Sequence, residues 1–394
     1  MTIRDIEVLN LRYEYPDDKR FRYAGGVCTG RLTSLVKVFT DDGIVGLGSV
    51  YSHPGLVRSI IEEQLRPLLI GEDPLEVEEL WERCYSVTRW YGRKGAAVSA
   101  LGGVDIALWD IRGKAAGKPI FELLGAQRNR VPAYASALLW KDSVEELQRE
   151  AERHLANGFQ AMKMRLGRRR EYDRAALASV REAIGPNNRL MIDGNARYSL
   201  EQARSLVDDF KRADVFWLEE PFLPEKPDDF VALRQDLDGI PLSAGENEFG
   251  PQGFRELIDG GIVQIVQPDC CRCGGLTAAL RIADAAAVRR LRVAPHTWSD
   301  AVALSANMHF VAAQSHAITV EMDQTGNPLI EELLTEPLTV VNGEVELPKA
   351  PGLGIELDPA VVDRYALDPD EPIPSGNYSD MVFGSGNYTP APPY

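Results

Sequence analysis

From residue 130 onward, short apolar runs alternate with stretches that carry apolar residues at helical spacing. A strand and a helix together take about 25 residues, which is the interval at which the runs recur. The first two strands are expected over 131–137 and 159–166. Helices are expected near 143–157, 171–184, 199–212, 227–237, 250–259, 274–290 and 300–314. This repeat predicts a barrel of parallel strands surrounded by helices.

A different pattern precedes the repeat. Residues 2–14 and 32–39 alternate like strands, Asp41-Asp42-Gly43 predicts a hairpin turn, and 44–51 predict the return strand. Apolar residues at helical spacing then predict three helices, over 55–68, 75–87 and 95–116. The first part of the chain is therefore expected to be an α+β module.

We expect four parts along the chain. The α+β module takes 1–125 and the barrel takes 126–330. Residues 331–367 include a strand–turn–strand pattern over 335–347, around Asn342-Gly343, and are expected to return to the N-terminal module. The last residues, 368–394, are rich in Pro, Gly, Asn and Tyr and predict an extended tail.

Six acidic or imidazole side chains follow the later apolar runs. They are separated by 26, 27, 23, 27 and 25 residues. In a barrel of this kind the carboxyl ends of the strands converge on one mouth, where reactive residues lie. We therefore expect these side chains to meet there: Asp193, Glu219, Glu246, Asp269, His296 and Glu321.

Three of these residues predict a metal site. Asp193, Glu219 and Glu246 offer hard oxygen ligands from adjacent strands, and such a set selects Mg²⁺ over zinc or copper. The alternative for any one of them is a helix N-cap or a loop charge. Glu219 is chosen over Glu220 because strand alternation from Trp217 puts these two glutamates on different faces.

His296 and Asp269 predict a base. They end neighbouring strands, and a carboxylate on one imidazole nitrogen raises the basicity of the other. The alternative is a hydrogen-bonded core histidine. Lys163 and Arg165 share a face of the second strand and are expected to point into the barrel, across from His296. The alternative for that pair is a solvent-facing position, which the apolar residues around it disfavour.

The composition of this 394-residue chain excludes some classes of binding partner. Its net charge of −16 argues against nucleic acid and anionic membranes, which both need a basic face. No apolar run is long enough for a membrane span, and the N-terminus shows no secretion signal. Together with an odd count of five cysteines, this predicts a cytoplasmic protein with reduced thiols. Cys270, Cys271 and Cys273 resemble a metal knuckle, but packing residues are the simpler interpretation.

The chain resembles the enolase superfamily in its mandelate racemase and muconate lactonizing branch. The resemblance covers almost the whole chain and depends on the order and spacing of several short stretches. These are 103–110 (GVDIALWD), 113–114, 117–119, 193–195 (DGN), 217–221 (WLEEP), 245–247 (GEN), 267–269 (QPD), 274–275 and 295–296. It implies an α+β capping domain on a modified (β/α)7β barrel.

The resemblance also implies roles for individual residues. Asp193, Glu219 and Glu246 would bind Mg²⁺, and His296 with Asp269 would be the general base. Glu321 matches the acid that hydrogen-bonds the substrate carboxylate, and Asn195 stands in the matching Asp-Gly-Asn stretch as an expected substrate contact. The implied chemistry is abstraction of the proton α to a carboxylate, with a small-molecule sugar acid as substrate.

One position departs from the family pattern. Members with two opposed bases have Lys-x-Lys on the second strand, whereas this chain has Lys163-Met164-Arg165. Arginine does not lose its proton at working pH, so racemisation, which needs two bases, is disfavoured. Dehydration needs one base: His296 removes the α-proton and then protonates the leaving β-hydroxyl. Lys163 and Arg165 would then hold the developing negative charge.

The capping domain is expected to contact the far end of the substrate. The candidates are polar loop residues, which favour a sugar acid over an apolar substrate, although each one is equally well explained as an ordinary surface residue: Lys19, Arg20, Arg22, Tyr23, Tyr51, Ser52, His53, Trp90, Tyr91 and Arg93. An acid-sugar dehydratase is the first expectation. A cycloisomerase of an anhydro-sugar acid or lactone, an epimerase or racemase of the same branch, and a non-catalytic binding barrel are the alternatives. A homo-oligomer is expected.

Overall fold

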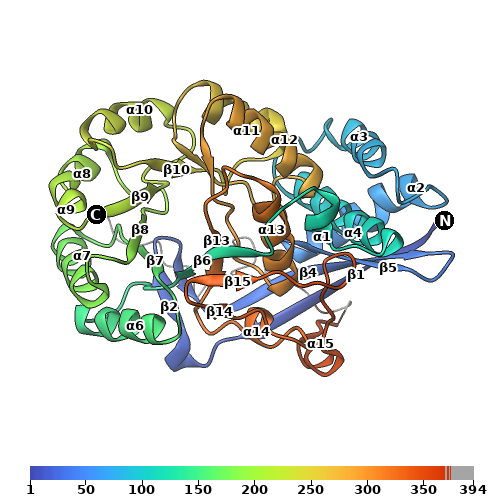
Figure 1. Ribbon diagram of the computed structural model, residues 1–394, viewed down its shortest axis with the longest axis horizontal. Helices are drawn as coiled ribbons and strands as arrows, with labels where there is room; N and C mark the ends of the chain where they lie inside the picture. The colour runs from blue at the N-terminus through green and yellow to red at the C-terminus, as the bar shows by residue number, and fades with distance from the viewer. Residues whose placement is uncertain (369–370, 372, 374–394) are drawn as a thin grey trace.

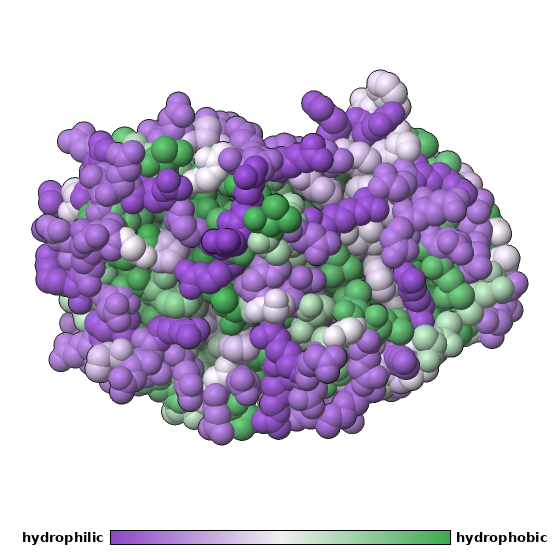
Figure 2. Space-filling view, turned by 45° about the horizontal axis from the view of Figure 1, so that its top comes forward, coloured by the Kyte–Doolittle hydropathy of each residue, from purple (hydrophilic) through white to green (hydrophobic). Residues whose placement is uncertain are grey.

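The computed structural model of the protein describes residues 1–368, 371 and 373. An N-terminal α+β module lies at the right of Figure 1 and a ring of strands and helices at the left. The tail expected over 368–394 lies almost entirely outside the described residues. On the face in Figure 2, hydrophilic residues dominate and hydrophobic ones form separate patches between them. Within the described part, no helix combines the length and apolar character that a membrane span requires.

The N-terminal module is built on an antiparallel sheet in the order β1-β4-β5. Its strands are β1 (Ile3–Glu14), β4 (Gly30–Thr40) and β5 (Val45–Val50). A 3₁₀ turn, η1 (Asp17–Lys19), and a small hairpin, β2 (Phe21–Tyr23) and β3 (Gly26–Cys28), connect β1 to β4. The helical elements are α1 (Pro54–Ile60), the π-helical turn η2 (Ile61–Leu65), α2 (Arg66–Leu69), α3 (Val77–Thr88), α4 (Ala96–Ala116) and α5 (Ile120–Leu123).

Two glycines bring helix α4 close to both parts of the molecule. A Cβ atom on Gly103 would lie 2.2 Å from Val50 Cγ2 in the sheet, and one on Gly102 would lie 2.8 Å from the Gly275 amide nitrogen. Only glycine allows backbones to approach this closely. Helix α4 is therefore held between the sheet of the module and the loop that follows a barrel strand.

The second part is a (β/α)7β barrel, as the sequence predicted. Its strands are parallel: β6 (Arg130–Ser136), β7 (Ala161–Arg165), β8 (Arg189–Asp193), β9 (Val215–Glu219), β10 (Leu242–Ala244), β11 (Ile265–Val266), β12 (Arg292–Val293) and β13 (Val320–Asp323). β13 pairs with β6, and a bridge between Val293 and Ala317 joins the other edge.

Helices separate these strands and form the outer ring. They are α6 (Val144–Ala156), α7 (Arg170–Ile184), α8 (Leu200–Arg204), α9 (Val207–Arg212), α10 (Pro227–Asp236), α11 (Gly250–Asp259), α12 (Gly275–Val288) and α13 (Ala301–Ala313). The helix expected over 199–212 is divided into α8 and α9. A capping box at Ser199 and Gln202 begins this segment by satisfying two exposed backbone N–H groups.

The C-terminal hairpin differs from the expectation. Strands β14 (Val340–Val341) and β15 (Glu344–Glu346) form, but β15 pairs antiparallel with β6 of the barrel and not with the module. The first residues of β6 extend beyond its parallel neighbours, so their backbone groups remain open to an added strand. The return to the module comes later, where Gly352 bridges Pro119 and Ala366 bridges Leu11. Two short helices, α14 (Pro328–Glu331) and α15 (Pro359–Tyr365), flank this region.

Buried polar side chains join the module to the barrel and to the C-terminal return. We call them the interface cluster: Arg31, Asp110, Asp300, His309 and Asp323. Asp300 begins helix α13 by accepting the backbone N–H groups of Val302 and Ala303, and its other oxygen accepts the hydroxyl of Ser49 at 2.6 Å. It also accepts the hydroxyl of Thr33 on β4. One carboxylate thus accepts hydrogen bonds from a barrel helix and from two strands of the module.

The other members act in the same way. Arg31 on β4 forms an ion pair with Asp323 on β13 at 2.7 Å. Asp110 on α4 accepts the backbone N–H groups of Leu47 and Leu353, each at 2.8 Å. Burial raises the pKa of both Asp110 and Asp300 against these hydrogen bonds. The interface cluster is therefore buried and specifically paired.

Candidate active site

The residues expected at strand ends lie around one mouth of the barrel. Asp193 and Glu219 are the last residues of β8 and β9. Glu246, Asp269 and His296 lie two or three residues beyond β10, β11 and β12, and Glu321 lies within β13. With Lys163 and Arg165 of β7 they form what we call the mouth cluster. Every member except Glu246 is buried.

A layer of apolar side chains beneath the cluster explains its geometry. Tyr134, Met191, Trp217, Ile265 and Ala294 pack together inside the barrel. Residues two apart on a strand share a face, so the residue two positions after each interior residue also points inward. Met191 is followed in this way by Asp193, Trp217 by Glu219 and Ala294 by His296. The Trp217 Nε1–H donates to Glu219 Oε2 at 3.0 Å, which confirms that Glu219 is the inward glutamate.

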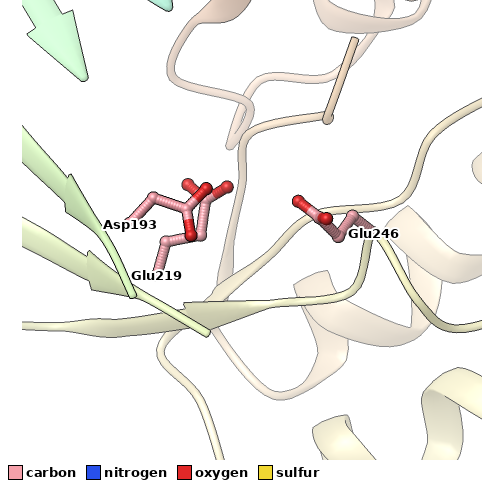
Figure 3. Close-up of side chains that lie close together, drawn as sticks. All are labelled: Asp193, Glu219 and Glu246. Atoms are coloured by element: carbon pink, nitrogen blue, oxygen red, sulfur yellow. The ribbon is translucent and has the colours of Figure 1, made fainter. Parts of the chain in front are cut away.

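Asp193, Glu219 and Glu246 form a group with metal-ligand geometry. Each offers one oxygen, and the three oxygens lie within 4.8 Å of one another. In Figure 3 the carboxylates of Asp193 and Glu219 lie side by side, and Glu246 faces them from the loop after the neighbouring strand β10. Among the described residues, it is the one group of this kind, so the cysteine knuckle considered from the sequence does not form one.

The donor set fits a hard divalent cation. Carboxylate oxygens are the ligands that Mg²⁺ takes from proteins, usually with room left for water or substrate oxygens. The mouth cluster contains five carboxylates and only two permanent cations, Lys163 and Arg165. Burying this negative charge is costly without further positive charge. The three ligand residues would hold the ion, with the cavity side left open.

The two cations of β7 lie among the acids. Lys163 Nζ is 2.5 Å from Glu219 Oε1 and 2.9 Å from Glu321 Oε1. Arg165 Nη1 is 2.5 Å from Asp193 Oδ2, and its guanidinium group lies 5.0 Å from the ring centroid of Trp298. Burial lowers the pKa of Lys163, but Glu219 and Glu321 outweigh burial and raise it above its usual value. Both side chains therefore point inward as predicted, and both carry charge.

His296 and Asp269 form the expected pair. His296 Nδ1 is 2.8 Å from Asp269 Oδ2, and Asp269 Oδ1 accepts the Cys271 N–H at 2.8 Å. This arrangement leaves Nε2 on the cavity side, 3.6 Å from Glu246 Oε2. Burial lowers the pKa of His296, but nearby acids, with Glu246 the strongest, raise it to about 9. The loop containing the cysteines thus fixes the carboxylate that orients the imidazole.

Glu321 is held by two donors. Its Oε2 accepts the Thr297 N–H at 3.0 Å, and its Oε1 faces Lys163. Burial raises the pKa of Glu321, but Lys163 and His296 outweigh burial and lower it to about 2. Glu321 is therefore an anion at neutral pH, and it is bound to the backbone of the residue that follows His296.

A cavity of about 680 Å³ opens above the cluster. Arg165, Asn195, Glu246 and His296 line its inner part, and the amide oxygen of Asn195 is buried without a hydrogen-bond partner. Tyr23 of the module also lines the cavity, as expected. So does Tyr51, whose ring centroid is 5.6 Å from that of His296.

Eight of the ten expected capping-domain contacts lie outside this lining, Arg20, Arg22, His53 and Trp90 among them. Arg20 pairs with Asp17 on the surface, and the backbone of Arg22 is bridged to Trp140. His53 is the residue before helix α1, and Trp90 is 80% exposed. The sequence shows that these loops are polar but not which residues of each loop face the barrel, so substrate contact by these residues stays a prediction.

Two family matches cover most of the chain. Residues 19–125 match the mandelate racemase / muconate lactonizing enzyme N-terminal domain, and residues 146–361 match the enolase C-terminal domain-like family. The chain belongs to the enolase superfamily, in its mandelate racemase branch. This enolase-superfamily chain therefore has the capping domain and barrel that its sequence predicted.

Curated relatives span nearly its whole length. It is 36% identical over 366 residues to the D-galactarolactone cycloisomerase of Agrobacterium fabrum, covering 90% of this chain and 96% of that one. It is 31% identical over 370 residues to the arabinonate dehydratase of Saccharolobus solfataricus, covering 92% and 99%. These relatives are enzymes that act on sugar acids or their lactones.

Solved structures agree in fold. The 3,6-anhydro-D-galactonate cycloisomerase of Zobellia galactanivorans superposes with a TM-score of 0.86 at 35% identity, covering 93% of this chain and all of that one. A racemase of Streptomyces coelicolor A3(2) gives 0.86 at 27% identity with the same coverage, and its structure contains bound magnesium. Magnesium is therefore the cofactor of this superfamily that fits the three carboxylates of this chain.

Several cavity residues of this superfamily member were not found from the sequence. Glu220 lines the cavity, and its carboxylate accepts the side-chain amide of Asn247 at 2.8 Å. Burial, with Glu246 second, raises the pKa of Glu220 to about 8. Lys94 and Glu248 also line the cavity. Glu248 stands two residues after Glu246, in the loop beyond β10, where alternation within a strand no longer indicates which side chains face the cavity.

Proposed function

We propose that the protein removes the proton α to the carboxylate of a sugar acid and then eliminates the oxygen substituent on the β-carbon. The geometry that supports this most directly is the pairing of Asp269 with His296 Nδ1 beside three carboxylates with metal-ligand geometry. A base and a binding place for the substrate carboxylate lie next to each other. Bound Mg²⁺ would supply positive charge to that carboxylate and lower the pKa of its α-carbon proton.

His296 takes part in two successive proton transfers. His296 Nε2 accepts the α-proton, and the C–H electron pair moves into the enediolate. Arg165 and Lys163 hold positive charge beside that site. The electrons then expel the β-oxygen, which takes the proton from the imidazolium of His296. The enol product finally becomes the keto acid.

The leaving oxygen decides the enzyme class. If it is a hydroxyl group, water is lost and the enzyme is a dehydratase. If it is a ring or lactone oxygen, the same steps open a ring and the enzyme is a cycloisomerase. The similarity to the cycloisomerase of Agrobacterium fabrum, at 36% against 31% for the arabinonate dehydratase, favours the ring oxygen.

Racemisation is the less suitable candidate. It needs a second base on the opposite face of the α-carbon, and position 165 holds an arginine. Lys163 Nζ is occupied by Glu219 and Glu321 at 2.5 and 2.9 Å, and Asp193 lies 3.6 Å away. The described mouth cluster therefore supplies one base.

The test is a screen of aldonic acids, anhydro-aldonic acids and lactones that carry a free carboxylate. Formation of a keto acid is measured with Mg²⁺, after EDTA treatment and after Mg²⁺ is restored. We expect activity to disappear with EDTA and to return with the metal. Full activity after complete chelation, or no exchange of any α-proton with D₂O across the screen, would contradict the proposed function.

A further inference from the structure

The outer part of the cavity has a charge pattern that the proposed chemistry does not use. Beyond the mouth cluster, acidic side chains predominate in the described lining, and Lys94 is the cation there: Glu225, Glu248, Glu256 and Lys94. They come from the loop after β9, the loop after β10, helix α11 and the segment before helix α4. A substrate that extends beyond the mouth cluster would therefore meet carboxylates from several elements.

The single outer cation is already paired. Lys94 Nζ donates to both oxygens of Glu248, each at 2.7 Å. The Glu248 side chain is only 12% exposed, whereas that of Lys94 is 57% exposed. The carboxylate is therefore the fixed partner, and it keeps the lysine charge away from a ligand. The inner cation, Arg165, is likewise paired with Asp193 at 2.5 Å.

The outer acids would affect charged and uncharged substrate groups differently. A second carboxylate at the far end of a substrate would lie near Glu225 and Glu256 without an unpaired cation in the described lining. Glu225 and Glu256 are exposed, so solvent weakens their repulsion of a second carboxylate, whereas the largely buried Glu248 would repel it more strongly. Hydroxyl groups have the opposite effect, because they donate hydrogen bonds to carboxylate oxygens. A lactone end carries no charge and avoids the repulsion.

We propose that the substrate has one free carboxylate, held at the mouth cluster, and an uncharged hydroxyl- or lactone-bearing far end, and that the Lys94–Glu248 pair helps to exclude acids with two carboxylates. This inference rests on the proposed function for the position of the first carboxylate. It narrows the substrate class to aldonic acids, anhydro-aldonic acids and lactones with a single free carboxylate.

The experiment compares six-carbon acids that differ at one end: D-galactonate, galactarate and the monolactone of galactarate. Dissociation constants for the Mg²⁺-loaded protein are measured by isothermal titration calorimetry, and kcat/KM is measured wherever turnover occurs. We expect D-galactonate or the monolactone to be preferred over galactarate by at least about ten-fold. Equal or tighter binding of galactarate by the wild type would overturn the inference.

Two matched variants test the ion pair itself. Glu248→Gln removes one negative charge and releases Lys94, whereas Glu225→Gln removes one charge and releases no cation. We expect the ratio of galactarate to D-galactonate affinity to rise at least about ten-fold in the first variant and clearly less in the second. Equal rises in both would show that Lys94–Glu248 has no special role and would contradict that part of the proposal.

The binding readout separates the two proposals. If all three acids bind in the expected order but no α-proton exchanges with D₂O, the proposed function fails and the charge selection stands. If α-exchange occurs with galactarate as readily as with the other two, the proposed function stands and the charge selection fails.

Discussion

The mouth cluster and the interface cluster are both buried and charged, yet they are built in opposite ways. Asp300 and Asp110 of the interface each receive hydrogen bonds from two or more elements, and Asp323 is paired with Arg31. At the mouth, polar atoms remain without partners: both ends of the Gln267 amide, the Asn195 oxygen and the Thr297 hydroxyl. Glu246 contacts His296 only at 3.6 Å.

This difference suggests that the interface cluster contributes mainly to stability and the mouth cluster mainly to function. Buried polar groups that are fully paired hold a unique arrangement of elements and are costly to disturb. Buried groups left unpaired, beside carboxylates that repel one another, destabilise the empty site and become favourable when a ligand arrives. We therefore expect substitutions at the mouth to affect mainly activity and substitutions at the interface to affect mainly the free energy of unfolding.

The largest effect on activity is expected from the proposed metal ligands. Asp193→Asn and Glu246→Gln should each lower kcat/KM by about 1000-fold or more, because the site loses a charged ligand. Thermal unfolding of Glu246→Gln in EDTA should show an unchanged or higher midpoint, since one of three mutually repelling carboxylates is gone and no buried lysine or arginine loses its partner. Glu78→Gln, which removes an equal charge from an exposed ion pair, is the control. Wild-type turnover in either mouth variant would remove that residue from the site.

Substitution of the proposed base, His296, is expected to reduce activity nearly as much, and it should also stop exchange of the α-proton. His296→Asn should abolish both turnover and exchange of the α-proton with D₂O, followed by NMR. Arg165→Lys should retain part of the turnover, roughly a tenth, because lysine keeps the charge but loses the planar guanidinium group. Residual exchange in His296→Asn that disappears only when Lys163 is also changed would identify Lys163 as a second base.

The mouth cluster could be predicted from the sequence because two simple periods define it. The interval of about 25 residues places strand ends together, and the alternation within a strand selects inward residues such as Glu219. The role of position 165 could be inferred because arginine, unlike lysine, does not lose its proton and cannot act as a base. All of this follows from local backbone geometry, which the sequence expresses directly.

The interface and the outer cavity could not be predicted in the same way. Asp300 and Asp110 look like ordinary loop and helix acids in the sequence, since their partners Ser49 and Leu353 are far away along the chain. Lys94 meets Glu248 across more than 150 residues. The packing of the module on the barrel decides these contacts, and no short-range period encodes that packing.

At the interface, breaking the buried ion pair should cost more than any single surface change. Asp323→Asn leaves the Arg31 guanidinium group buried without its carboxylate, which typically costs about 3–5 kcal/mol. Urea unfolding followed by circular dichroism gives the difference from the wild type. Glu78→Gln again serves as the control and should change stability by less than about 1 kcal/mol. Equal losses in the two variants would contradict the distinction between interface and surface.

The smallest expected effect concerns His309, which joins helix α13 to α5 and the C-terminal return. Its Nδ1 accepts the Phe121 N–H at 3.1 Å, so its Nε2–H donates to the Leu353 carbonyl at 3.1 Å. Burial lowers the pKa of His309 from 6.5 to about 4, and the bond to Leu353 opposes this only in part. Between these pH values the unfolded chain binds a proton that the folded protein does not, so this contribution is complete above pH 6.5 and is lost as the pH falls toward 4. It amounts to about 3 kcal/mol at most.

His309→Gln cannot titrate, and its free energy of unfolding should therefore fall less steeply than that of the wild type between pH 7 and 4. Unfolding curves at each pH measure the difference, and parallel profiles for the two proteins would show that His309 does not resist protonation in the fold.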